Sequence, residues 1–403
     1  VVVPVAFSLS NAVLASGDFD DDGDDELVIA EQSSGSLANS GRVLVLRHTG
    51  ASWVIQESIE QGANGYAGVA ESGDMFGSSL AVGDFDDDGY DDLAIGAKGE
   101  DVGSVDSAGA MLIAYGSSTG IDGARDQLIT RSNDGLTVAP AVLELYGFAL
   151  ASGDFNDDGY DDIAIGAPRA RCPNGTDQAG AVVTMLGSAS GIVNTGTRQF
   201  RPGVLGVLGS CTDGLGFGAK LVNGAFDFGG TSDLAIATSE NAVHVLYGEE
   251  GTGLVTDDDQ RITPTALPGG SAGDLRFGIS MAAGGFNSDP FNIFPGSSSL
   301  AIGATFDTVN GVIKAGSVYV LPGSFSGLQP AQAVRFTRSA ALESGPPVAV
   351  DLFGAALAGA DFNGDLKRDL AIGVPYSDDA SFNNSGAVQV LYGSEFIFRN
   401  GFE

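Results

Sequence analysis

The chain has few of the residues that most often carry catalysis or bind nucleic acid. Its 403 residues include only two histidines, two cysteines and one tryptophan, and lysine and arginine together number 18. The two cysteines and the two histidines are far apart in the sequence, so they form no clustered Cys/His zinc motif. Against the 18 basic residues stand 52 acidic ones, giving a net charge of −34. Nucleic acid and anionic membrane surfaces are poor partners for such a chain, and we expect neither.

Long apolar runs and the common catalytic motifs are also absent. No apolar run approaches the roughly 18 residues that span a bilayer, so we expect no membrane insertion. No phosphate loop or dinucleotide fingerprint occurs. The match to GxSxG at 116–120 is not followed by a helix, which a nucleophile elbow requires. His48 and His244 are expected to be solvated or packed, and we predict that the protein is not an enzyme.

The chain is instead rich in glycine, with 61 residues, and carries a repeated acidic loop. The clearest copy runs from Asp84 to Asp92 and reads DFDDDGYDD. With Asp84 as position 1, side-chain oxygens stand at positions 1, 3, 5 and 9, glycine stands at position 6, and position 7 offers its backbone carbonyl. Ca²⁺ takes six to eight oxygen ligands, and glycine permits the left-handed turn that folds a chain around an ion. The loop therefore predicts a calcium site.

Three further copies begin at Asp18, Asp154 and Asp361. The last has Leu366 where glycine is expected, so Leu366 must adopt a positive φ or the loop must reshape. A solvated acidic turn is the alternative, because Asp, Asn and Gly are common turn residues. Four copies in one phase, each followed by an apolar strand, favour three to four Ca²⁺ ions. The predicted ligands are Asp18, Asp20, Asp22, Asp24 and Glu26; Asp84, Asp86, Asp88, Tyr90 and Asp92; Asp154, Asn156, Asp158, Tyr160 and Asp162; and Asp361, Asn363, Asp365, Lys367 and Asp369.

These loops are not EF-hands. An EF-hand needs a glutamate at position 12 and flanking helices, whereas position 12 is an isoleucine inside an apolar strand in every copy (Ile29, Ile95, Ile165 and Ile372). The ion would clamp a β-hairpin.

The loops belong to a repeat that opens with an aromatic–glycine pair eight residues before position 1. The pairs are Phe76-Gly77, Tyr146-Gly147, Phe217-Gly218, Phe277-Gly278 and Phe353-Gly354, and six repeats begin near residues 10, 76, 146, 217, 277 and 353. Each repeat has four short strands between glycine-rich turns. This pattern predicts one all-β domain over residues 1–403, a β-propeller of four-stranded antiparallel blades. Repeats four and five lack most of the oxygens and should be metal-free.

The repeat resembles the FG-GAP repeat family, best known from the integrin α-subunit propeller and from secreted bacterial proteins. The resemblance rests on the order of Phe-Gly, then DxDxDG, then Gly166-Ala167-Pro168. The resemblance implies metal loops between the first and second strands at one face, with ligands meeting the opposite face. Integrin-type propellers have seven blades, so seven is the alternative to the six repeats counted here.

Cys172 and Cys211 fall in connections that emerge on the same face of a propeller, opposite the metal loops. We predict a disulfide between them, with two free buried thiols as the alternative. Both chain ends are strand-like, at 1–7 and 396–398, and each could complete the last blade. A spare end strand would permit self-association.

The leading hypothesis is a non-enzymatic, calcium-stabilised propeller that binds a protein or glycan ligand through long loops opposite the metals. A structural subunit of an appendage or matrix is the second hypothesis, and a polysaccharide lyase the third. Two cysteines and calcium loops suggest an extracellular or cell-surface location. The chain starts VVVPVAF without a visible signal peptide. We expect a mature exported chain, although a cytoplasmic protein would start the same way.

Overall fold

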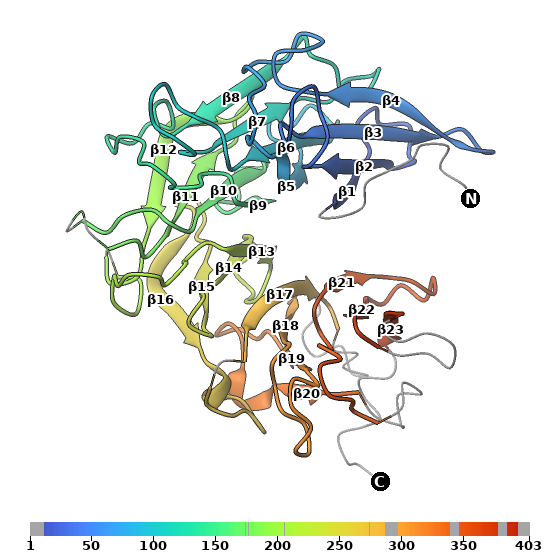
Figure 1. Ribbon diagram of the computed structural model, residues 1–403, viewed down its shortest axis with the longest axis vertical. Coiled ribbons are helices and arrows are strands. Elements are labelled where there is room, and N and C mark those ends of the chain that lie inside the picture. Colours follow the sequence, from blue (N-terminus) through green and yellow to red (C-terminus); the bar gives the residue numbers. More distant parts are fainter. Residues whose placement is uncertain are drawn as a thin grey trace. The chain divides into compact units, whose positions relative to one another are not determined.

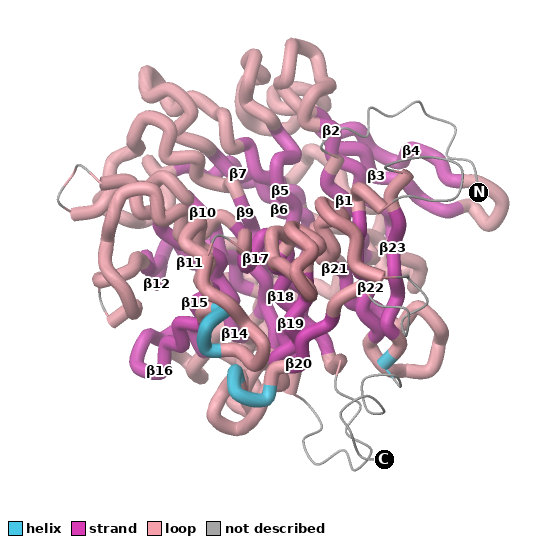
Figure 2. Tube along the Cα trace, turned by 60° about the horizontal axis from the view of Figure 1, so that its bottom comes forward, coloured by secondary structure: helices cyan, strands magenta, loops and turns pink. Residues whose placement is uncertain are grey.

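The described part of the chain folds as strands and loops, with helix confined to short turns (Figure 2). The computed structural model describes residues 12–173, 175, 177–204, 206–273, 275–286, 297–338, 346–377 and 385–393. Its short 3-10 turns include η1 (Pro264–Ala266) and η2 (Pro330–Gln332). In these described ranges no helix is both long and apolar enough to cross a membrane. The prediction of an all-β chain is confirmed.

Six antiparallel sheets follow one another along the chain, one for each predicted repeat (Figure 1). We number them as blades 1 to 6 and name the strands of each blade A to D in chain order. Blades 1 to 3 contain β1 (Val13–Gly17), β2 (Glu26–Glu31), β3 (Arg42–His48) and β4 (Trp53–Ile59); β5 (Phe76–Gly83), β6 (Asp92–Ala97), β7 (Ala110–Ala114) and β8 (Asp126–Thr130); and β9 (Ala149–Gly153), β10 (Asp162–Ala167), β11 (Ala181–Leu186) and β12 (Val193–Phe200).

The second half of the chain repeats this order. Blades 4 to 6 contain β13 (Lys220–Gly224), β14 (Asp233–Ala237), β15 (Val243–Tyr247) and β16 (Val255–Ile262); β17 (Phe277–Gly284), β18 (Ser299–Ala304), β19 (Ser317–Leu321) and β20 (Val334–Phe336); and β21 (Leu357–Ala360), β22 (Asp369–Val374) and β23 (Ala387–Leu391). The prediction of a six-blade propeller is confirmed, and the alternative of seven blades is not. The two end strands proposed to complete blade 6 lie outside the described residues.

Contacts divide the chain into two compact units of three blades each. The first holds residues up to 219 except 155–157, and the second holds 155–157 and residues 220–403. That the two units form a single domain remains a prediction.

Strand B is buried on both faces, as its unbroken apolar sequence predicts. Every residue of β6 and of β10 is buried, with sequences DLAIGA and DIAIGA. Glycine in this strand permits close approach of the next blade. A Cβ on Gly96 would lie 2.2 Å from the carbonyl oxygen of Gly147.

The aromatic residue of the aromatic–glycine pair bridges to the glycine that precedes strand C of the blade before it. Phe76 is 1% exposed and packs among strands of blades 1 and 2. Its backbone pairs with Gly41, which precedes strand C of blade 1, and a Cβ on Gly41 would lie 2.0 Å from the Phe76 carbonyl oxygen. The bridges Gly109–Tyr146, Gly180–Phe217 and Gly316–Phe353 repeat this contact. The motif is therefore a joint between blades.

The turns of each blade gather at two ends. At one end, the A–B loop of blade 1 meets the C–D turn of blade 2, where the Ser117 amide donates to the Phe19 carbonyl at 3.2 Å. At the other end, B–C loops meet D–A connections, as where the Phe76 amide donates to the Ser40 carbonyl at 2.9 Å. We call these the acidic-loop end and the long-loop end. Cys172 and Cys211 form a disulfide at the long-loop end of blade 3, so the predicted pairing is confirmed.

Candidate metal centres

The A–B loop of blade 2 gathers its carboxylates as the sequence predicts. Asp84, Asp86 and Asp92 each place one oxygen within 4.8 Å of the others. The Asp84 carboxylate accepts the amides of Asp88 at 3.1 Å and Gly89 at 3.0 Å, which wraps the chain around it. Gly89 has φ +90°, the left-handed conformation expected at position 6.

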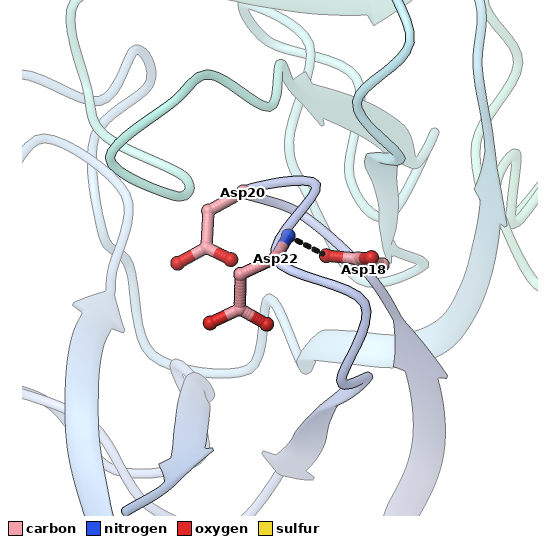
Figure 3. Close-up of side chains that lie close together, drawn as sticks. All are labelled: Asp18, Asp20 and Asp22. Carbon is pink, nitrogen blue, oxygen red and sulfur yellow. Dashed lines mark hydrogen bonds between the residues drawn. The ribbon is translucent and has the colours of Figure 1, made fainter.

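The A–B loop of blade 1 has the same construction (Figure 3). Asp18, Asp20 and Asp22 each place an oxygen within 4.8 Å of the others. Asp18 accepts the amides of Asp22 at 3.1 Å and Gly23 at 2.9 Å, and Gly23 has φ +90°. Two loops separated by 66 positions in the sequence thus reach one geometry.

The two loops differ in which residues complete the cluster. In blade 1 the third carboxylate of the close group is position 5, Asp22, whereas in blade 2 it is position 9, Asp92. In both, the side chain at position 3 is nearly enclosed, with Asp20 and Asp86 only 5% and 3% exposed, against 33% and 36% for Asp22 and Asp88 at position 5.

The A–B loops of blades 3 and 6 repeat the backbone wrap with asparagine at position 3. Asp154 accepts the amides of Asp158 and Gly159, and Asp361 accepts that of Leu366 at 2.7 Å. Leu366 takes φ +64° and is 95% exposed, so the loop keeps its shape at the cost of a strained leucine. Among the described residues, neither loop forms a group of three carboxylates within 4.8 Å.

Position 9 has a second role that the sequence analysis missed. In blade 2 the Asp92 carboxylate accepts the amide of Phe85 at 2.9 Å through one oxygen and that of Gly116 at 2.8 Å through the other. It therefore ties the acidic loop to the end of strand C. Asp369 makes the same pair of bonds, at 2.9 and 2.7 Å, in blade 6.

Blade 4 keeps this tie although its loop lacks two of the predicted ligands. Its position 9, Asp233, accepts the amides of Phe226 at 2.6 Å and Gly248 at 3.0 Å, although positions 1 and 5 of its loop are Ala225 and Gly229. An acid kept at position 9 where positions 1 and 5 have none was the available sequence signal. In blade 5, Asn287 and Asp289 lie outside the described residues, and the prediction that blades 4 and 5 are metal-free remains a prediction.

Successive acidic loops in the first unit are joined to each other. The Asp91 carboxylate, at position 8 in blade 2, accepts the Asp18 amide of blade 1 at 2.9 Å, and the Asp91 amide donates to the Asp18 carbonyl at 3.1 Å. Asp161 and Asp84 repeat this pair at 3.2 and 3.0 Å. The position-1 residue that would bind metal in one blade is thereby held by the loop of the next blade.

Burial disfavours the charged form of the acid at position 9 in the loops of blades 1 and 2. The pKa of Asp92 is raised to about 8, chiefly by burial and also by neighbouring Asp86 and Asp84, against the hydrogen bonds from Gly116 and Phe85. Burial also raises the pKa of Glu26 to about 7. A bound divalent cation would favour the ionised forms of both groups.

Unpartnered oxygens test whether the residues fit a cation. The Oδ1 atoms of Asp20 and Asp86 are buried, and neither accepts a hydrogen bond from any described residue. A buried carboxylate oxygen without a donor is costly, and a hard cation removes that cost. The donor set of carboxylates and carbonyls, without nitrogen or sulfur, suits Ca²⁺ and fits the predicted ion.

Comparison with known proteins gives the same division of the chain. A family model described as "FG-GAP repeat" matches residues 10–46, 76–111, 146–185 and 353–391, the four repeats with complete acidic loops. Phosphatidylinositol-glycan-specific phospholipase D of Rattus norvegicus is 31% identical over 173 residues, 42% of this chain and 20% of that protein. Integrin alpha-4 of Xenopus laevis is 31% identical over 163 residues, 40% of this chain and 14% of that protein.

A longer match is to integrin alpha-PS2 of Drosophila melanogaster, which is 29% identical over 248 residues, 59% of this chain and 16% of that protein. The chain thus spans a fifth or less of the length of these relatives. The matched repeats coincide with blades 1, 2, 3 and 6, in each of which an acidic loop precedes the buried strand B. The prediction of FG-GAP repeats in a β-propeller is thus confirmed in four of the six blades.

Proposed function

We propose that this chain is a calcium-stabilised adhesion or binding module, without enzymatic activity, that acts outside the cell. The observation that carries the proposal is the pair of acidic loops in blades 1 and 2, each with a buried, unpartnered oxygen at position 3. Calcium held in these loops is structural, because the loops join strands A and B of their blades. The disulfide supports an oxidising compartment.

The proposed ligand is a protein or a glycan that meets the long-loop end. In the first unit, six of the nine exposed large apolar side chains of the described residues lie in B–C loops or D–A connections: Leu37, Val69, Val138, Val142, Leu143 and Leu208. Exposed apolar side chains rimmed by polar loops suit a macromolecular partner. The integrin relatives support binding rather than catalysis as the role of the propeller.

The match to a phospholipase D does not favour an enzyme, because it covers only 20% of that protein. The GxSxG segment also lacks the geometry of a nucleophile. The Ser117 hydroxyl donates to the Gly120 carbonyl at 2.7 Å within its own turn.

The proposed ligand face is tested with two matched double variants. Val138→Asp/Val142→Asp places charge on the D–A connection between blades 2 and 3, and Val54→Asp/Ile55→Asp places the same charge on outer strand β4. All four side chains are 41–46% exposed. The labelled protein is applied to glycan and matrix-protein arrays in Ca²⁺. If only the first variant loses binding to an array spot that the wild type binds, the result supports ligand binding at the long-loop end. Equal binding by both variants contradicts it.

A further inference from the structure

Each carboxylate at position 3 that carries an unpartnered oxygen is also paired with an arginine. Asp86 Oδ2 contacts the Arg125 guanidinium, which also lies 3.7 Å from Asp88. Asp20 Oδ2 lies 3.2 Å from Arg47, which also donates to Asp22 at 2.6 Å. In both blades one oxygen of the aspartate meets an arginine while the other accepts no hydrogen bond from the described residues.

The two arginines reach their loops from different places in the blade. Arg47 lies on β3, immediately after Leu46, which pairs with Leu27 of β2. Arg125 precedes β8 and stacks over the Tyr115 ring, with its guanidinium carbon 4.5 Å from the ring centroid. Tyr115 is the counterpart of Arg47, since it follows Ala114, the partner of Leu93. The two arginine–aspartate pairs therefore do not arise from the same position of the repeat.

Blade 3 carries neither arginine at the corresponding places. Leu186 follows Met185, the partner of Ile163, and so stands where Arg47 stands. Gly196 lies as far beyond Gly187 as Arg125 lies beyond Gly116, and a Cβ on Gly196 would meet Leu186 at 2.8 Å. Position 3 of this blade is Asn156 instead of aspartate.

We propose that Arg125 and Arg47 are positioning residues that convert an aspartate at position 3 into the equivalent of an asparagine. An asparagine offers a cation one side-chain oxygen and no charge. An aspartate with its Oδ2 held by arginine likewise leaves Oδ1 for the cation, and the pair is neutral. Positions 1, 3, 5 and 9 of blade 2 carry four negative charges, which Arg125 reduces to three; those of blade 3 carry three.

This inference rests on the proposed calcium sites, whose affinity the two arginines would set. Arg125 without its aspartate would repel the cation, and Asp86 without its arginine would leave four carboxylates in mutual repulsion when metal is absent. The two single substitutions should therefore change calcium affinity in opposite directions. A merely structural role for Arg125 would weaken binding in both.

The test is a double-variant cycle with Asp86→Asn, Arg125→Gln and Asp86→Asn/Arg125→Gln, with calcium binding measured by isothermal titration calorimetry. We expect Asp86→Asn to weaken one site about tenfold and Arg125→Gln to tighten the same site about three- to tenfold, as a nearby charge would. The double variant should return to within about twofold of the wild type. In EDTA, Arg125→Gln should melt at a lower temperature than the wild type.

Two controls locate the effect. Arg261→Gln removes the same charge from outer strand β16 of blade 4 and should leave calcium binding unchanged. In an Asp84→Ala background, which disables the loop of blade 2, Arg125→Gln should no longer alter the affinities of the remaining sites.

If the wild type binds calcium and Arg125→Gln binds it with equal or weaker affinity, the inference is overturned and the calcium proposal stays intact. A double variant as weak as Asp86→Asn also overturns it. Absence of calcium binding by the wild type overturns the calcium proposal, and this inference with it.

Discussion

Tyr115 of blade 2 occupies the space in which a side chain of Gly191 in blade 3 would stand. A Cβ on Gly191 would lie 1.9 Å from the Tyr115 hydroxyl oxygen. That hydroxyl accepts the amide of Ile192 at 2.9 Å and donates to Gln127 at 2.6 Å. In the second unit, Tyr247 has the same relationship to Gly327 and to the amide of Leu328, at 3.0 Å. In blades 2 and 3, and in blades 4 and 5, a tyrosine of one blade therefore packs against and hydrogen-bonds the next, at a position that has room only for glycine.

Gly191→Ala should destabilise the protein strongly, because the methyl group collides with a phenol and Gly191 has φ +86°. We expect a loss of about 3 kcal/mol or more in the free energy of unfolding, measured by urea denaturation. Gly50→Ala is the matched control, since Gly50 has φ +77° but no described atom within 4 Å of a Cβ. It should cost only the backbone strain of about 1–2 kcal/mol. Equal losses would contradict the collision.

Calcium should stabilise the folded protein through the acidic loops. At a free calcium concentration 100 times its dissociation constant, each site adds about 2.7 kcal/mol to the free energy of unfolding. Asp84→Ala should reduce the difference in melting temperature between Ca²⁺ and EDTA, measured by calorimetry. Asp227→Ala, in the loop of blade 4, should leave that difference unchanged. A wild type with the same melting temperature in both buffers would refute calcium stabilisation.

Glu100 should make stability fall as pH rises toward neutrality. Burial raises its pKa from 4.5 to about 7, while the hydrogen bond from Gln61, at 2.7 Å, opposes the shift and Asp74, Glu71 and Asp101 add to it. The folded state therefore holds a proton that the unfolded chain releases. The resulting stability is complete below about pH 4.5 and is lost as pH rises through 7.

Glu100→Gln should remove this dependence and raise the free energy of unfolding at pH 8 by about 1–3 kcal/mol. Urea denaturation from pH 5 to 8 provides the measurement. The exposed Glu240→Gln is the control and should leave the pH profile unchanged. If the free energy of unfolding of Glu100→Gln changes with pH in parallel with that of the wild type, the pKa of Glu100 is not raised by folding.

Reduction of the Cys172–Cys211 disulfide should lower the free energy of unfolding by about 2–4 kcal/mol. The bond connects the B–C loop of blade 3 to the connection that follows β12, and its loss frees both. Cys172→Ala/Cys211→Ala should match the reduced wild type and should not respond to reductant. A reductant effect that persists in the double variant would have another origin.

The repeated features of the fold could be predicted from sequence because they depend on local patterns. The unbroken apolar run of strand B, such as Leu93–Ala97, marks a strand buried on both faces. The acidic spacing from Asp84 to Asp92 is formed within one loop, so its geometry follows from the order of residues. The disulfide was predictable because the strand order brings its two loops to one end.

The contacts that could not be predicted join residues from different strands or blades. Arg125 meets Asp86 across a gap of 39 positions, and the Tyr115 hydroxyl meets Ile192 across 77. Neither pair occupies a fixed position in every repeat, so no spacing rule indicates it. These contacts depend on which strand turns a long side chain toward a neighbouring loop.

If the acidic loops bind calcium as proposed, the double use of position 9 affects how such sites can be gained and lost during evolution. Blade 4 uses this acid in its fold, since Asp233 accepts the amides of Phe226 and Gly248 beside a loop without acids at positions 1 and 5. Changes at positions 1, 3 and 5 can therefore remove a site without opening the blade. The same three changes in reverse can restore a site around an acid that is already in place. Individual blades can thus vary in calcium binding from one descendant to another while the shared framework persists.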